Sequence, residues 1–228
     1  MSTGVDRVGD AGGRTTKEAA GLRAPGRRRT WTVVAIAAVA LLAVISMVVA
    51  VAAGRAEPKL TGTALGKEPS PGFQLRDSSG QGYSLSQFRG KVVVLTFLYT
   101  HCPDQCPLTA EILRHADEAA DHPKDVVYLA VSIDPNGDTP DSIAQFTQDH
   151  HLDALGDRWH YLVGTPPELQ GVWKSYYIYA PADPSIAAGT DHTTGMYFID
   201  KHGNRRLYTS LPVAPEDVAR NILLLANR

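Results

Sequence analysis

Two cysteines, Cys102 and Cys106, are the only ones in the chain, and both lie in the run Thr-His-Cys-Pro-Asp-Gln-Cys-Pro at residues 100–107. A cysteine thiolate is both a nucleophile and a soft metal ligand, so a pair of them suits redox chemistry or the binding of a soft metal ion. The alternative is a structural disulfide. A loop of about five residues, however, gains only roughly 2 kcal/mol from loop entropy, against about 5 kcal/mol for a loop of about 100 residues. We therefore predict that both cysteines are working thiols.

The spacing of the cysteines does not by itself decide between redox chemistry and the binding of a metal ion. Three residues separate them, one more than in the Cys-x-x-Cys of thioredoxin-type dithiols. On a regular helix such a pair holds its Cβ atoms about 5–6 Å apart, whereas a disulfide needs about 3.8 Å, so closing it requires local movement. Pro107 suits the first helical position, which leaves Cys106 near the N-cap. We therefore expect the helix dipole to lower the pKa of Cys106.

A third ligand would secure a soft metal ion such as copper between the two thiolates, and an imidazole best completes such a site. Of the eight histidines, His192 stands in a polar loop, residues 189–195, just before a predicted strand. The others fall beside a strand, on or at the ends of helices, or in turns, and His160 lies within an apolar strand and is expected to be structural. Spacing alone makes His192 a candidate ligand and does not decide the question.

The elements that must position these residues alternate between strands and helices. Residues 91–99 and 126–132 are continuous β-branched and aromatic runs typical of buried central strands, and residues 159–163 predict a third strand. The predicted helices cover residues 107–120 and 140–151, a short stretch after the capping box Thr165-Pro166-Pro167-Glu168, and the chain from Pro215 onwards. Hairpins are expected at residues 73–85 and 196–208. This order predicts a thioredoxin-like α/β fold with a mixed central sheet, whose catalytic groups follow the carboxyl ends of strands.

Charge and hydropathy divide the N-terminal part from the rest. Residues 1–29 carry seven basic and three acidic residues, whereas the remainder carries 15 basic and 21 acidic ones, so we expect no nucleic-acid partner. Residues 31–53 are uncharged and apolar, and as a helix of roughly 34 Å they would cross a hydrocarbon core of about 30 Å. Four arginines precede this run closely and two basic residues follow it, which places the N-terminus in the cytoplasm.

The predicted organisation therefore has four segments: a basic cytoplasmic tail (1–30), a transmembrane helix (31–53), a linker with three prolines (54–71) and a thioredoxin-like domain (72–228) outside the cytoplasm. A cleaved signal peptide is the alternative, because Ala50-Val51-Ala52 resembles a cleavage site. The apolar run is longer than the roughly 7–15 residues of a usual signal core, which favours a single-pass membrane protein. Both alternatives place the domain outside the cytoplasm.

Three motifs occur together in this chain: Thr-x-Cys-Pro-Asp-x-Cys-Pro at residues 100–107, Val-Ser-Ile-Asp-Pro at 131–135 with Asp-Thr-Pro at 138–140, and Asp-His-Thr-x-x-x-Tyr-x-x-Asp at 191–200. In combination they resemble the Sco/SenC family over about residues 60–228. The resemblance implies copper, as Cu(I) or Cu(II), bound by Cys102, Cys106 and His192. It also implies delivery of that copper to the CuA site of cytochrome c oxidase, with the copper-bearing oxidase subunit or another cuproprotein as partner.

Three acidic residues near the motifs have two interpretations each. Asp191 either orients the imidazole of His192 or caps a turn. Asp134 either tunes the thiols from the end of a core strand or forms a turn with the proline that follows. Asp104, between the cysteines, either caps the helix or repels a second anion.

Three functions are compatible with these residues. The first is a copper chaperone, which binds and transfers metal and is not an enzyme. The second is a thiol–disulfide oxidoreductase in which Cys102 and Cys106 are a catalytic redox pair that reduces the cysteines of the oxidase copper site. Thioredoxin-type reductases carry a cis-proline before the strand that faces the dithiol, and no proline lies at residues 191–199. The third is a thiol peroxidase, suggested by residues 73–99, but a peroxidase does not require His192.

Overall fold

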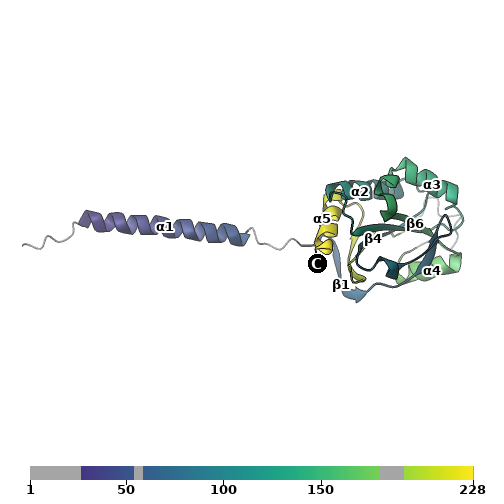
Figure 1. Cartoon of the computed structure of the whole chain (residues 1–228), viewed down its shortest axis with the longest axis horizontal. Helices are drawn as coiled ribbons and strands as arrows, with labels where there is room; N and C mark the ends of the chain where they lie inside the picture. The colour runs from purple at the N-terminus through teal and green to yellow at the C-terminus, as the bar shows by residue number, and fades with distance from the viewer. Residues whose placement is uncertain (1–26, 54–58, 180–192, 228) are drawn as a thin grey trace, which may run out of the picture. The chain divides into compact units, whose positions relative to one another are not determined.

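The structure is a computed structural model of the 228-residue chain and describes residues 27–53, 59–179 and 193–227 (Figure 1). Two compact units make up the chain, Met1–Glu57 and Pro58–Arg228. Residues 180–192 lie outside the described part, and with them His192 and Asp191.

In its described part, the first unit is a single helix, α1 (Arg27–Ala53). Within it, Trp31–Val49 is long and apolar enough to cross a membrane. Its large apolar side chains are all exposed, with exposed fractions from 48% to 71%. A helix that is apolar on every side is stable in hydrocarbon rather than in water. The helix therefore fits the predicted span at residues 31–53, although a signal sequence has the same character. The orientation across the membrane stays a prediction.

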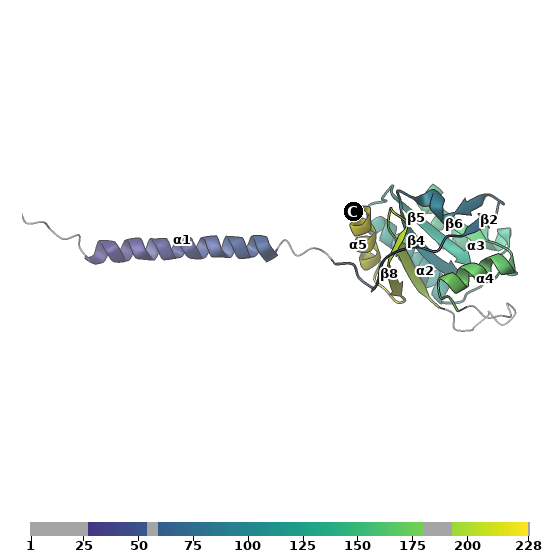
Figure 2. The same ribbon diagram turned by 90° about the horizontal axis from the view of Figure 1, so that it is seen from below.

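The second unit is one eight-stranded sheet with helices on both faces (Figures 1 and 2). Its strands are β1 (Thr63–Pro69), β2 (Gln74–Asp77), β3 (Gly82–Ser84), β4 (Val92–Leu98), β5 (Val126–Ser132), β6 (Trp159–Val163), β7 (Gly195–Ile199) and β8 (Asn204–Ser210). Its helices are α2 (Gln105–Ala119), α3 (Pro140–Asp149), α4 (Pro166–Ser175) and α5 (Pro215–Ala226), with short 3-10 helices at Leu85–Phe88 and Leu152–Arg158.

The strands follow the order β1-β8-β7-β4-β5-β6-β2-β3 across the sheet. The three central strands β4, β5 and β6 are parallel, and the hairpins at both ends of the fold pair antiparallel with them. Strands β4, β5, β6 and β2 are successive neighbours in the sheet and are labelled in Figure 2. The predicted mixed sheet with two hairpins is confirmed.

Strands β4 and β5 form the centre of the core, and all seven residues of each are buried. On one face, Tyr128 of β5 donates a hydrogen bond to Asp117 of α2 (2.9 Å). On the other face, the ring of Phe97 packs against Tyr176 at the end of α4, with centroids 5.7 Å apart. Helices α2, α3 and α5 lie on the first side of the sheet and α4 on the second (Figure 1). Because both faces are covered, these strands read as continuous apolar runs.

The predicted linker at residues 54–71 is wrong in its second half. Strand β1 lies there and pairs antiparallel with β8, so the folded unit begins near Pro58. The strand is at the edge of the sheet, most of its residues are exposed, and it contains a register shift near Gly66, whose φ is +81°. An exposed, interrupted edge strand lacks the alternation of apolar residues that identifies a strand in a sequence.

The chain joins the sheet through a fixed contact at Thr61. Asn221, fully buried on α5, accepts the Thr61 N–H and donates its own amide to the Thr61 carbonyl, both at 2.8 Å. The next residue, Gly62, has a φ of +137°, and a Cβ there would lie 2.7 Å from the carbonyl oxygen of Tyr208. The start of the folded unit is therefore held by α5 and β8.

The predicted helix starts of α3 and α4 are confirmed. Thr139 is the N-cap of α3, with Pro140 in the first turn. At α4, Thr165 and Glu168 form a capping box, in which the Thr165 side chain accepts the Glu168 N–H and the Glu168 side chain accepts the Thr165 N–H at 2.7 Å. Helix α3 ends at Asp149, two residues before its predicted end.

Candidate metal centre

Cys102 and Cys106 lie where β4 leads into α2, beyond the carboxyl end of a central parallel strand. Both are free thiols and both are buried, with exposed fractions of 6% and 0%. A parallel sheet places its reactive groups at this end, so the fold puts the two sulfurs in the position that the element order predicted.

Helix α2 begins at Gln105, two residues before its predicted start. Asp104 is the N-cap, and its side chain accepts the Gln105 N–H at 2.5 Å, so the capping interpretation of this residue is confirmed. Pro107 is therefore the third helical residue and Cys106 the second. A proline is tolerated there because the first four N–H groups of a helix have no partner within the helix.

The two sulfurs face each other across the start of α2. The backbone N–H of Cys106 donates to Sγ of Cys102 at 3.3 Å, and the Cys106 thiol donates a side-chain hydrogen bond to it. This thiol hydrogen bond is the main reason that the pKa of Cys102 is lowered to about 5; burial opposes it, and the backbone N–H groups of Asp104 and Cys106 add to it. Cys102 is thus the thiolate of the pair at neutral pH.

The pKa of Cys106 is raised, so the prediction that the helix dipole lowers it is wrong. The causes are its hydrogen bond to Cys102, its complete burial and the negative charge of Cys102, with a further contribution from Asp138. Burial and a facing thiolate outweigh the dipole at this position. The pair therefore holds one proton between two sulfurs, and a bound cation would displace it.

Asp138, which the sequence places in the second motif but does not mark as a candidate site residue, is buried beside the cysteine loop. Its Oδ1 accepts the backbone N–H of Thr100 at 2.7 Å. Its Oδ2 accepts the hydroxyls of Ser132 (2.6 Å) and Tyr161 (2.9 Å). Burial raises its pKa, and these hydrogen bonds act against that. Asp138 stands four residues after Asp134 in a polar turn, and no spacing rule distinguishes it from a turn residue.

The carboxylate of Asp134 serves the turn before α3. Its Oδ1 accepts the backbone N–H groups of Gly137 (2.9 Å) and Asn136 (3.3 Å). Of the two interpretations of Asp134, these contacts favour turn formation.

The residues on either side of 180–192 contact each other, and those that follow lie next to β4. Thr193 accepts the backbone N–H of Tyr179 at 3.1 Å, which joins the two sides. Strand β7 then begins at Gly195, whose carbonyl accepts the hydroxyl of Thr96 at 3.0 Å. The residues that follow His192 therefore return to the sheet beside the carboxyl end of β4. The role of His192 itself stays a prediction.

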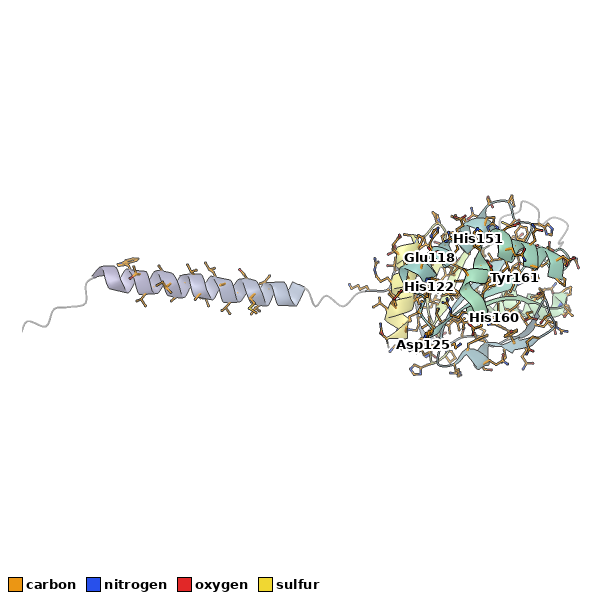
Figure 3. The ribbon with its side chains drawn as sticks, turned by 45° about the horizontal axis from the view of Figure 1, so that its top comes forward. Glu118, His122, Asp125, His151, His160 and Tyr161 are labelled. Carbon is orange, nitrogen blue, oxygen red and sulfur yellow. The ribbon has the colours of Figure 1, made fainter. Side chains whose placement is uncertain are left out.

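Other histidines lie in separate parts of the fold. The ring of His160 packs against the rings of Tyr83 (centroids 4.5 Å apart) and Phe88 (5.5 Å), as expected for a structural residue. His122 contacts Asp117 at 2.7 Å at the end of α2. His122 follows α2, His151 lies in the turn after α3, and His160 lies on β6 (Figure 3). Among the described residues, no group of three or more His, Cys, Asp or Glu side chains could hold a metal ion.

Residues 62–227 match the sequence pattern of the SCO1/SenC family. The chain belongs to the SCO1/SenC family. Among its relatives, the mitochondrial protein SCO2 of Saccharomyces cerevisiae is 34% identical over 140 residues, which cover 58% of this chain and 44% of that protein. The mitochondrial SCO2 homologue of Bos taurus is 30% identical over 157 residues, or 66% and 57% of the two chains. The chain spans about half the length of these curated relatives.

Solved structures of the SCO1/SenC family share the fold. The structure of Bradyrhizobium japonicum ScoI with copper bound is 29% identical, has a TM-score of 0.52, and covers 69% of this chain and 99% of its own. The solution structure of apo Sco1 from Thermus thermophilus is 28% identical, has a TM-score of 0.57, and covers 76% and 99%. The predicted thioredoxin-like fold and the resemblance to this family are both confirmed.

Proposed function

We propose that this chain is a copper chaperone that takes part in the assembly of cytochrome c oxidase. It holds one copper ion through Cys102, Cys106 and His192 and passes it to the CuA site of the oxidase or to another cuproprotein. The observation that carries the proposal is the facing pair of buried free thiols at the carboxyl end of β4, where the pKa of Cys102 is lowered to about 5. Membership of a family with copper-bound members supports it.

Copper is the cargo of such a protein, and the thiols suit it chemically. Soft thiolate ligands favour Cu(I), and an imidazole completes a three-coordinate site. Cu(II) would need a further oxygen ligand, because it prefers four or more ligands in a tetragonal arrangement. Binding requires both sulfurs as thiolates, so it displaces the proton held by Cys106. Transfer then proceeds by exchange of these ligands for the thiols of the acceptor.

His192 is the third ligand in this proposal. Three residues further along the chain, the carbonyl of Gly195 bonds the hydroxyl of Thr96 on β4. The motif that contains His192, together with the cysteine motif, supports its selection over the other seven histidines.

Localisation completes the proposal. Helix α1 anchors the protein in a membrane with its N-terminus in the cytoplasm, and the thioredoxin-like domain lies outside, where a copper-bearing oxidase subunit can meet it. The apolar surface of α1 and the basic residues that precede it support this arrangement.

An anaerobic copper titration of the full-length chain in detergent tests the proposal. The variants are Cys102→Ser, Cys106→Ser and His192→Ala, and His151→Ala is the matched histidine control on an exposed turn. We expect one tightly held copper per chain, a strong loss of affinity in each of the three variants, and no change in the control. If His192→Ala retained its affinity for both Cu(I) and Cu(II), the three-ligand proposal would be wrong.

A second candidate is a thiol–disulfide reductase, favoured by the unequal thiols. The Cys102 thiolate would attack a partner disulfide and release one partner thiolate; Cys106, after losing its proton, would then attack the sulfur of Cys102 and release the second. Two electrons leave the dithiol, which becomes a disulfide. Incubating Cys106→Ser with an oxidised CuA-site peptide would trap the mixed disulfide if this reaction occurs, and its absence would exclude the reaction.

A further inference from the structure

We infer that Asp138 is a positioning residue that holds the backbone of the cysteine loop and so sets Cys102 opposite Cys106. The inference rests on the proposed function, in that these two sulfurs are the site. Asp138 contacts neither copper nor substrate in this view and acts through Thr100.

The carboxylate of Asp138 connects the three neighbouring strands β4, β5 and β6. Thr100, which donates its N–H to Oδ1, follows β4; Ser132, which donates to Oδ2, ends β5; and Tyr161, labelled in Figure 3, lies on β6. Asp138 is 7% exposed, and the side chain of Tyr161 is buried with it. A buried acceptor with three donors has one stable position, so it fixes whatever it binds.

The loop that Asp138 holds leads directly to the first sulfur. The N–H of Cys102 donates to the carbonyl of Tyr99 at 3.4 Å, which closes a tight turn around Thr100. The hydroxyl of Thr100 donates to Ser142 at 3.0 Å, so the same residue is tied to α3 as well. With Thr100 fixed, the turn delivers Sγ of Cys102 to the N–H of Cys106. Releasing Thr100 would let Cys102 move while Cys106 stays on the helix.

Two conservative substitutions of Asp138 distinguish an effect of its position from an effect of its charge. Asp138→Asn keeps an acceptor oxygen opposite Thr100, and its amide can donate to the rotating hydroxyls of Ser132 and Tyr161. Asp138→Glu keeps the charge and moves the carboxylate by one methylene. A positioning role therefore predicts that the asparagine variant works and the glutamate variant fails, whereas a purely electrostatic role predicts the reverse.

Asp117 supplies the matched control. It is a buried carboxylate on α2 that also accepts hydrogen bonds from several donors, among them Tyr128 (2.9 Å) and Arg158 (2.9 Å). It lies towards the opposite end of α2 from Cys106. Asp117→Asn and Asp117→Glu should lower the melting temperature without changing the chemistry of the thiols.

The first measurement needs no metal. The reduced full-length chain in detergent is equilibrated in glutathione buffers, and the dithiol–disulfide ratio is read by alkylation and mass. The second is Cu(I) affinity by competition with a chromophoric chelator. We expect Asp138→Glu to shift the metal-free equilibrium about tenfold towards the dithiol and to weaken Cu(I) binding about tenfold or more. Asp138→Asn should stay within about threefold of wild type in both, and both Asp117 variants should match wild type.

Two results would overturn the inference. One is an asparagine variant as impaired as the glutamate variant or more so. The other is a glutamate variant that loses as much melting temperature as the Asp117 variants and has the same dithiol–disulfide ratio and the same Cu(I) affinity as they do. If wild type bound no copper but the metal-free ratios followed the expected pattern, the proposed function would fall and the positioning role of Asp138 would stand.

Discussion

The low pKa of Cys102 depends on the side chain of Cys106, so replacing Cys106 tests how the pair is built. The Cys106 thiol contributes most to lowering this pKa to about 5, and backbone N–H groups contribute less. Cys106→Ala removes the thiol donor and keeps the backbone donors, whereas Cys106→Ser substitutes a hydroxyl donor of similar size. We expect the pKa of Cys102 to rise towards the ordinary thiol value of about 8.5 in the alanine variant and to stay low in the serine variant.

The difference is large at neutral pH. A thiol with a pKa of about 5 is roughly 99% ionised at pH 7, whereas one with a pKa of about 8.5 is roughly 3% ionised. The rate of alkylation would hide this difference, because a thiolate of low pKa is also a weaker nucleophile and the two effects nearly cancel. The midpoint of the titration is therefore the quantity to measure.

The assay follows the ultraviolet absorbance of the thiolate in the reduced, metal-free chain as the pH rises, with circular dichroism to confirm that the chain stays folded. Wild type should show a first step near pH 5 and a second step above the ordinary thiol range, because the pKa of Cys106 is raised. A wild-type first step near about pH 8.5 would refute the hydrogen-bond reasoning. Equal midpoints in the alanine and serine variants would show that another group lowers the pKa.

Three further predictions concern proton release and stability. Cu(I) binding at pH 7 should release about one proton, rather than nearly two as from an unstructured dithiol, because Cys106 alone retains its proton; calorimetry in buffers of different ionisation enthalpy measures this number. Arg158→Met should destabilise the fold by about 3 kcal/mol in urea unfolding at pH 7, because it leaves the buried Asp117 without its cation. Burial raises the pKa of Asp117, but hydrogen bonds, that of Arg158 first, outweigh it and the net pKa is lowered. Its stabilisation is thus present above the unfolded pKa of about 3.9 and lost as the pH falls through the folded value, so the penalty of the variant should shrink in acid. Asn221→Ala should cost about 1–3 kcal/mol, because the backbone groups of Thr61 lose both partners; a variant as stable as wild type would show that water replaces the amide.

The parts of the fold that could be predicted from the sequence are those with a local cause. Strands β4 and β5 are recognisable because burial on both faces selects continuous runs of apolar residues. The starts of α3 and α4 are recognisable because caps use side chains within a few residues of the backbone they bind. Strand β1 could not be predicted, since its partner β8 follows it by more than 100 residues and its own side chains face solvent.

In the candidate site, too, features with a local cause could be predicted and features that depend on distant residues could not. The cysteine motif predicts which residues react, but the direction of the pKa shift of Cys106 depends on how deeply the start of α2 is buried, which no motif contains. The predicted start of α2 at Pro107 is two residues too late. A proline is compatible with several positions of the first turn, and the Asp104 cap decides among them. Asp138 acquires its role from Ser132 and Tyr161 on two other strands, so its role exists only once the sheet has formed.

A reductase and a metallochaperone make different demands on a dithiol, and the charge of this pair favours the second. Two buried sulfurs that share one proton carry a single negative charge. Replacing the proton by Cu(I) leaves that charge unchanged, so loading exchanges one monovalent cation for another and adds no buried charge to a fold in which such charge is costly. Oxidation to the disulfide removes both the proton and two electrons and leaves the neighbouring Asp138 carboxylate facing a neutral pair. We therefore expect the resting state of the thiols to favour a monovalent soft cation, with Cu(I) as the oxidation state that the site receives first.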